Sequence, residues 1–250
     1  MLSLHDYSTV RVFGASVYPL IYTARKTAPN AATSVYYQRM RDIHTVAVEY
    51  PIAYKRLHHP HPWVLVSETM GALVDRLQRD FPSLASMAEV WGAATVGEAY
   101  TLQAQIQECA QPQPSDLKLV NSGTIDRYTF HWDDKPVRYL GKSYRHPIVS
   151  SDALMTLSAK RHWQATQPKL LVSGMSQRLE VAIDPIGTIL AGKSTVVIFS
   201  PIDLRYLLGI LNSHLVTLFF TTTFQGNRLQ GGYLRVGAPQ IRQIPIPLLI

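Results

Sequence analysis

The sequence contains little cysteine, few acidic residues and no long apolar run. Its single cysteine, Cys109, excludes an internal disulfide and a cysteine-based zinc site. The most apolar stretch, Leu204 to Phe220, is interrupted by Arg205 and by the polar residues 212–214, and it is too short to span a bilayer comfortably. The N-terminus shows neither a basic leader nor an apolar signal region. These absences predict a soluble, cytoplasmic protein without a membrane segment.

The scarcity of acids is concentrated in the second half of the chain. Residues 1–116 carry 9 Lys and Arg against 10 Asp and Glu, a net charge of −1, whereas residues 117–250 carry 15 against 7, a net charge of +8. From Lys135 to Arg178, eight basic residues accompany one acid, Asp152. A basic half joined to a neutral half is typical of a polyanion-binding surface. A solvated basic face without a partner is the alternative.

Two candidate ligand sites are unconvincing in their sequence context. The letters GTILAGKS, Gly187 to Ser194, satisfy the pattern of a phosphate-binding loop. Such a loop is followed by a helix, but the next residues, Thr195–Phe199, form the most strand-like run in the chain. Lys193 is therefore predicted to be a cation at a hairpin tip. His58, His59 and His61 lie among prolines with no acid nearby, so we expect a surface loop and no metal site.

The hydrophobic patterns predict a mixture of strands and helices. Strands are expected at Thr9–Phe13, Ala15–Ala24, Ala99–Ile106, Lys169–Val172, Leu179–Ile183 and Thr195–Phe199. Helices are expected from an N-cap at Ser67 to Arg79, over the short segment Ser83–Trp91, and from an N-cap at Ser200 through Phe219. Strands mixed with irregularly placed helices indicate an α+β fold. The proline- and histidine-rich connector Tyr50–Trp63 is a plausible domain boundary.

An ordered series of short motifs in the second half carries a family resemblance. The series begins with VNSGTIDRY at Val120–Tyr128 and continues with Arg138-Tyr139-Leu140, Gly174-Met175-Ser176, Leu208–Leu215, Gly231–Val236 and Ile241–Pro247. It resembles the TaqI-like C-terminal specificity domain of N6-adenine DNA methyltransferases. The opening residues, from Asp6 to Lys26, resemble the last strands of the catalytic domain in such enzymes. The resemblance implies a methyltransferase remnant with a linker at residues 1–60 and a DNA target-recognition domain at residues 61–250.

The resemblance also bears on catalysis and partners. Enzymes of this kind use an Asn/Asp-Pro-Pro-Tyr/Phe motif that holds the flipped adenine, and the sequence contains neither that tetrapeptide nor a glycine-rich S-adenosylmethionine loop. We therefore expect no catalytic residue and no cofactor in this chain, with S-adenosylmethionine bound only where another chain supplies a catalytic domain. The expected partner is double-stranded DNA. The alternative is a docking subunit that pairs with a separate methyltransferase or restriction chain, or forms a homodimer, through residues 1–60.

Basic and aromatic side chains beside the predicted strands are the candidates for DNA contact. They are Arg127, Tyr128, Lys142, Tyr144, Arg145, Lys160, Arg161, Arg178, Lys193, Arg228 and Arg235. We expect three segments to face DNA together: Lys135–Arg178, Gly187–Ser194 and Gly226–Arg235. Trp132 is expected in the core, and Asp126 and Asp184 are expected in turns or ion pairs.

Overall fold

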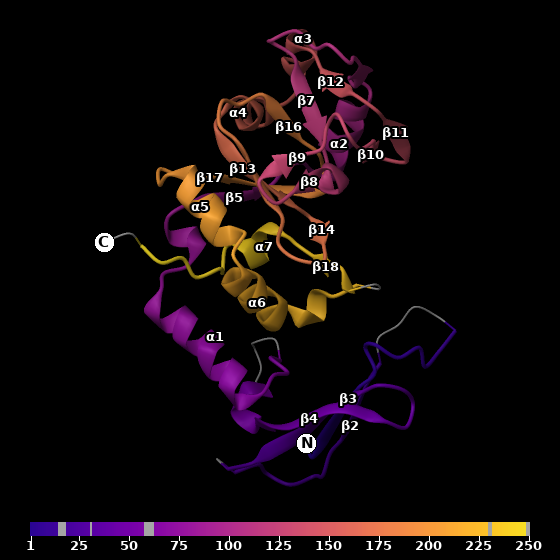
Figure 1. Ribbon diagram of the computed structural model, residues 1–250, viewed down its shortest axis with the longest axis vertical. Helices are drawn as coiled ribbons and strands as arrows, with labels where there is room; N and C mark the ends of the chain where they lie inside the picture. Colours follow the sequence, from indigo (N-terminus) through magenta and orange to yellow (C-terminus); the bar gives the residue numbers. More distant parts are fainter. Residues whose placement is uncertain (15–18, 31, 58–62, 230–231, 249–250) are drawn as a thin grey trace. The chain divides into compact units, whose positions relative to one another are not determined.

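The computed structural model describes residues 1–14, 19–30, 32–57, 63–229 and 232–248 (Figure 1). The histidines at 58, 59 and 61 and part of the strand expected over Ala15–Ala24 lie outside these residues. The chain divides into two compact units. The first comprises Met1–Asp80 with Thr222–Gly226, and the second comprises Phe81–Thr221 with Asn227–Ile250. This division falls after the connector Tyr50–Trp63, at Asp80.

The first unit is built on one four-stranded sheet with the order β2-β1-β3-β4. Its strands are β1 (Ser3–Asp6), β2 (Leu20–Thr23), β3 (Ser34–Met40) and β4 (Val46–Ala53), followed by the 3-10 turn η1 (Tyr54–Leu57) and helix α1 (Glu68–Asp80). One face of the sheet packs Leu4, Val35 and Ile52 into a small core. The expected strand at Thr9–Phe13 is absent from the described part of this segment, and β2 is an edge strand whose four residues are all exposed.

The second unit contains two four-stranded sheets. The first has the order β16-β7-β12-β6 and the second β15-β13-β17-β5. The first sheet contains β6 (Gln107–Glu108), β7 (Leu117–Val120), β12 (Pro147–Val149) and β16 (Ile189–Ala191). The second contains β5 (Glu89–Gly92), β13 (Lys169–Ser173), β15 (Val181–Asp184) and β17 (Thr195–Phe199). Three two-stranded ladders complete the strands: β8 (Ile125–Asp126) with β9 (Thr129–Phe130), β10 (Val137–Tyr139) with β11 (Lys142–Tyr144), and β14 (Met175–Ser176) with β18 (Leu234–Arg235).

Helices and 3-10 turns follow Asp80 in the chain, and all belong to the second unit except the last two residues of α6 and the first two of η4. They are η2 (Leu84–Ser86), α2 (Val96–Gln103), η3 (Ser122–Thr124), α3 (Ser151–Leu154), α4 (Ala159–Thr166), α5 (Leu204–Leu211), α6 (His214–Thr223), η4 (Gln225–Asn227) and α7 (Ala238–Ile241). Residues of both sheets, including Val120, Ile148, Leu171 and Val197, share one core. A second core joins Leu119 and Leu190 to residues of α2, α3 and α4. The predicted α+β class is confirmed, as are the core position of Trp132 and the strands at Lys169 and Thr195.

Two expected elements of the second unit are also wrong. Ala99–Ile106 is largely the helix α2, because Thr95 and Glu98 form a capping box in which each side chain accepts the other's backbone N–H. Ser83–Trp91 contains only the turn η2 before the chain enters β5.

The expected long helix after Ser200 is two helices. Asp203, rather than Ser200, caps α5, since its carboxylate accepts the Arg205 N–H at 2.7 Å. The helix ends at Asn212, whose side chain accepts the Val181 N–H and donates to the Val181 carbonyl, which ties the end of α5 to β15. The axes of α5 and α6 meet at 61°. Within the described residues no single helix is long and apolar enough to cross a membrane; only this bent pair passes that test on length and composition.

Candidate nucleic-acid interface

Three loops converge at one end of the β15-β13-β17-β5 sheet, and Gly174 lies at their meeting point. Gly174 N–H donates to Ser194 O and to Ser122 Oγ, both at 3.0 Å. Its carbonyl accepts Val236 N–H at 3.0 Å, which fixes the start of the ladder of β14 and β18. A Cβ at position 174 would lie 2.1 Å from Ser194 O, so only glycine fits. We call this region, where Ser173 and Thr195 lie, the loop end of the sheet.

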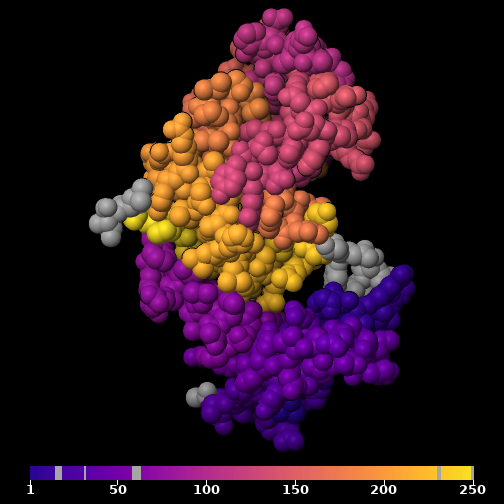
Figure 2. Space-filling view, viewed as in Figure 1, coloured from indigo at the N-terminus to yellow at the C-terminus, as the bar shows by residue number. Residues whose placement is uncertain are grey.

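Asn121 extends the loop end to the hairpin of β10 and β11. Its side-chain carbonyl accepts Ser194 N–H at 3.2 Å, and its amide donates to Arg138 O at 2.8 Å. Ser122 adds a bond from its hydroxyl to Ser194 O and accepts a further bond from Ser173 Oγ at its carbonyl. The motif VNSGTIDRY, the motif Gly174-Met175-Ser176 and residues 234–236 of the glycine-rich motif, which are far apart in the sequence, therefore meet here through hydrogen bonds. Figure 2 shows the pink, orange and yellow segments of the second unit meeting on one face.

The loop end is rich in basic side chains. Those on its segments are Arg127 in the turn between β8 and β9, Lys135, Arg138 on β10, Arg178 between β14 and β15, Lys193 in the turn before β17, and Arg235 on β18. All of them are exposed or half-buried. Arg228 belongs to the same group. It forms an isolated antiparallel β-bridge with Leu234, and Leu234 pairs with Ser176 in the ladder of β14 and β18. Of the sequence-predicted candidates, the structure thus brings together Arg127, Tyr128, Arg178, Lys193, Arg228 and Arg235.

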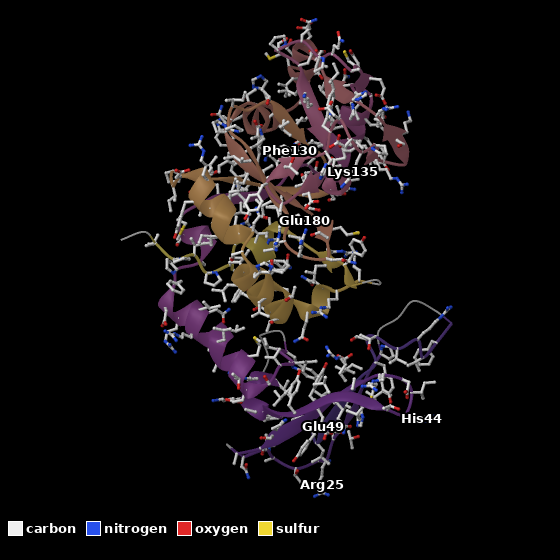
Figure 3. All side chains as sticks on the ribbon, viewed as in Figure 1. Arg25, His44, Glu49, Phe130, Lys135 and Glu180 are labelled. Atoms are coloured by element: carbon white, nitrogen blue, oxygen red, sulfur yellow. The ribbon has the colours of Figure 1, made fainter. Side chains whose placement is uncertain are left out.

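Two carboxylates lie among these cations. Asp126 is 3.8 Å from the Arg178 guanidinium, and its pKa is lowered, chiefly because it accepts the Arg127 N–H. As expected, the Asp126 side chain stabilises a turn and forms an ion pair with Arg178. Glu180 is half-buried, and this burial raises its pKa, aided by the Asp126 charge and opposed by Arg178 and Lys135. Figure 3 shows Glu180 and Lys135 in the same part of the unit as Phe130.

The hairpin of β10 and β11 carries Lys142 and Tyr144, with Arg145 just beyond it. Leu140 and Gly141 have φ angles of 44° and 82° and form its tight turn. The carboxylate of Glu108 accepts the backbone N–H groups of Arg145 and His146, each at 2.8 Å, and so fixes the chain just after β11. These three candidates extend the basic surface away from Gly174.

Arg161 does not belong to this surface. Its side chain is 2% exposed, and its guanidinium donates to Ala93 O at 2.6 Å, to Ala191 O and to Gln164 Oε1. Desolvation lowers its pKa to about 10. The expectation that Arg161 contacts DNA is therefore corrected: it links the residue after β5 to the end of β16 inside the fold.

Lys160 does not belong to the basic surface of the loop end either. Its ammonium lies 4.4 Å from the centre of the Trp91 ring, next to the aromatic cluster of Trp91, Trp163 and Phe199. Figure 1 shows α4 and α5 on one side of the second unit and β11, β14 and β18 on the other. The expectation that the whole segment Lys135–Arg178 lines one surface is therefore wrong for α4.

The other end of the same sheet, which we call the helix end, carries a buried ion pair. Lys169 Nζ lies 2.6 Å from Asp184 Oδ2, and both side chains are 1% exposed. Asp184 also accepts the N–H groups of residues 187–189, as expected for a turn and ion-pair residue. A hollow of about 600 Å³ opens at this end, between Trp163, Phe199 and Leu204.

The structure rejects a nucleotide site at Gly187–Ser194. Lys193 lies in a turn that leads into strand β17 and not into a helix. The predicted hairpin is also wrong, since β16 pairs in parallel with β7 while β17 pairs with β13 and β5. Lys193 thus lies on a link between two sheets. No group of His, Cys, Asp and Glu suited to a metal ion occurs among the described residues.

Sequence reasoning missed the residues that hold the loops together. The sequence presents Asn121 and Ser122 only as part of a motif, and Arg138 is not among the predicted candidates. The available signal is the polar pair Asn121-Ser122, which lies between the buried strand β7 and Gly123 and is typical of a loop held by side-chain hydrogen bonds.

Comparison with known proteins gives one match, to a family model. The model of the TaqI-like C-terminal specificity domain matches residues 117–246, more than half of the chain. A search of curated proteins found no match. The matched range contains Asn121, Gly174, Lys193 and Arg235, and so includes the whole loop network. The chain belongs to the family of TaqI-like C-terminal specificity domains, the DNA target-recognition modules of restriction–modification systems.

Proposed function

We propose that this chain reads duplex DNA through the loop end, as the specificity module of an adenine-N6 methyltransferase whose catalytic domain is supplied by another chain. In that assembly S-adenosylmethionine binds to the catalytic domain, and this chain selects the sequence. We place the assembly in the cytoplasm with the cell's DNA. The observation that carries the proposal is the convergence of cations on loops that Asn121, Ser122 and Gly174 hold in fixed positions.

The chemistry of the loop end suits DNA. Basic side chains neutralise phosphates and release counterions, which supplies affinity at low salt. Arginine also reads guanine through two parallel hydrogen bonds, which supplies specificity. Loops held by a hydrogen-bond network present these groups with little loss of entropy on binding. Lys142, Tyr144 and Arg145 extend the proposed surface along the hairpin of β10 and β11.

The test is a salt series of fluorescence anisotropy with a labelled mixed-sequence duplex. The variant carries Arg138→Ala, Lys193→Ala and Arg235→Ala. If each residue contacts a phosphate, the slope of log affinity against log salt falls by about three units. The charge-matched control carries Lys160→Ala, Arg205→Ala and Arg76→Ala, which are exposed cations of α4, α5 and α1. The control keeps nearly the wild-type slope, and equal losses in both variants would contradict the proposal.

A second role, docking of a partner chain, is favoured by one observation in the first unit. The edge strand β2 exposes Ile21 and Tyr22, by 51% and 63%, and its outer edge has no neighbouring strand among the described residues. Such an edge is a template for pairing with another chain. We propose it as the surface that binds the methyltransferase subunit. Light scattering of the chain with that subunit tests the idea: Tyr22→Lys should abolish the complex, and an unchanged complex would contradict it.

A further inference from the structure

The turn between β8 and β9 presents a tyrosine in a backbone conformation that aromatic residues rarely adopt. Tyr128 has a φ of 69°, in the left-handed region. Its side chain is 57% exposed, so packing of the ring in the core does not explain why a tyrosine occupies the position. Residues persist in such conformations where the surroundings impose them, and they cluster at functional sites.

The surroundings of Tyr128 fix the turn from both sides. Its N–H donates to Val181 O of β15 at 2.8 Å. The preceding guanidinium, that of Arg127, donates to Leu179 O at 3.4 Å and to Thr217 Oγ1 at 3.2 Å. Ile125, in the strand β8 that leads into the turn, is buried in the core shared by the two sheets. The backbone is therefore held while the ring remains in solvent.

The turn that carries Tyr128 lies among three basic and two acidic side chains. Arg127, Arg178 and Lys135 are the basic groups that act on Glu180, the residue before Val181, and Figure 3 labels both Glu180 and Lys135. Cations that hold the sugar-phosphate backbone, combined with an aromatic ring that stacks on a base, are the usual means of binding unstacked nucleotides. Trp132, by comparison, is 3% exposed and bonded to Pro147 O, so it is closed to such a role.

We propose that Tyr128 is a stacking residue that packs its ring against a nucleobase face where the base stack of a duplex is interrupted. The inference rests on the proposed function, since it requires the loop end to bind DNA. Stacking would add sequence specificity that hydrogen bonds do not supply. The free energy of unstacking differs between base-pair steps, so a step that unstacks easily accepts the ring at lower cost.

The test uses two labelled mixed-sequence duplexes, each with 2-aminopurine at the centre of one strand. In the intact duplex a base lies opposite the 2-aminopurine, and in the other duplex that position is an abasic site. Wild-type protein is expected to bind the abasic duplex about tenfold more tightly than the intact one and to quench the 2-aminopurine. Tyr128→Phe keeps both effects, whereas Tyr128→Ala loses both and retains the salt slope of the intact duplex. Tyr100→Ala, which removes a 61% exposed tyrosine from α2, is the matched control and keeps both effects.

Circular dichroism and thermal melting confirm that each variant is folded. If wild-type protein binds both duplexes equally, or if Tyr128→Ala keeps the preference, the stacking role is overturned while DNA binding stands. If wild-type protein binds neither duplex at low salt, the proposed function itself fails, and this inference fails with it.

Discussion

The two ends of the β15-β13-β17-β5 sheet use basic side chains in opposite ways. At the helix end Lys169 is sealed against Asp184 in the interior. At the loop end Arg235 and Arg178 are exposed and Lys193 is half-buried, on loops that are hydrogen-bonded to one another. Lys169 and Arg178 belong to the same basic stretch of sequence. The difference shows that the net charge of a segment does not define a surface, because a strand sends its residues to both ends of a sheet.

The strongest test of this comparison removes the cation of the helix end. Lys169→Met leaves the Asp184 carboxylate buried without its counter-charge, so the free energy of unfolding should fall by about 3–5 kcal/mol. Urea denaturation measures the loss. Under conditions in which the variant remains folded, its DNA affinity should match wild type, since Lys169 is distant from the loop end. A loss below about 1 kcal/mol would show that the pair is solvated.

Arg161 provides the next largest effect, because it is a cation that looks like a surface residue in the sequence. Arg161→Met removes charged donors from the carbonyls of Ala93 and Ala191, which should lower the free energy of unfolding by about 3 kcal/mol. The neighbouring substitution Lys160→Met, at an exposed position, should cost less than about 1 kcal/mol. Thermal melting of the pair gives the comparison, and equal costs would contradict the burial of Arg161.

The contrast between Arg161 and Lys160 also shows where sequence reasoning stops. Strands with a strong local signal, such as Thr195–Phe199, were predicted at their observed bounds. The burial of Arg161 depends on two carbonyls supplied by Ala93 and Ala191, which are distant in the chain, and no local pattern encodes that meeting. The same holds for Lys193, whose turn joins two different sheets.

Some errors had a local signal that was available and outweighed. Thr95-Val96-Gly97-Glu98 is a capping-box pattern, yet the apolar composition of the residues after it favours a strand. Asn212-Ser213 interrupts the leucine stripe and marks the end of α5. At the site, the motif series singles out segments that the structure joins, while Asn121 and Ser122 emerge as the joining residues only when the hydrogen bonds are known.

Tyr128 offers a smaller effect whose sign is diagnostic. In the left-handed region glycine is unstrained and alanine is not, so Tyr128→Gly should be more stable than Tyr128→Ala by about 1 kcal/mol. The matched pair at Tyr100, in the helix α2, should show the opposite order by a similar amount. Chemical denaturation of the four variants provides the measurement. The same order at both positions would mean that the turn at Tyr128 is relaxed.

The smallest effect concerns the acid of the loop end. Burial, aided by Asp126, raises the pKa of Glu180 above its ordinary value of 4.5, so the folded state favours the protonated carboxyl. The ionised form therefore costs stability at neutral pH, and that cost disappears as the pH falls through the raised pKa to below 4.5. Glu180→Gln should thus raise the free energy of unfolding at pH 7 by no more than about 0.5 kcal/mol, with no gain below pH 4.5.

The same substitution should also tighten DNA binding slightly, because it removes a negative charge beside Arg178 and Lys135. Glu89→Gln, at an exposed carboxylate of the helix end, makes the same change in net charge away from the loops. Anisotropy at low salt should separate the two variants, with the gain confined to Glu180→Gln. Equal gains would mean that DNA responds to total charge alone, and the distinction between the two ends of the sheet would then have no bearing on binding.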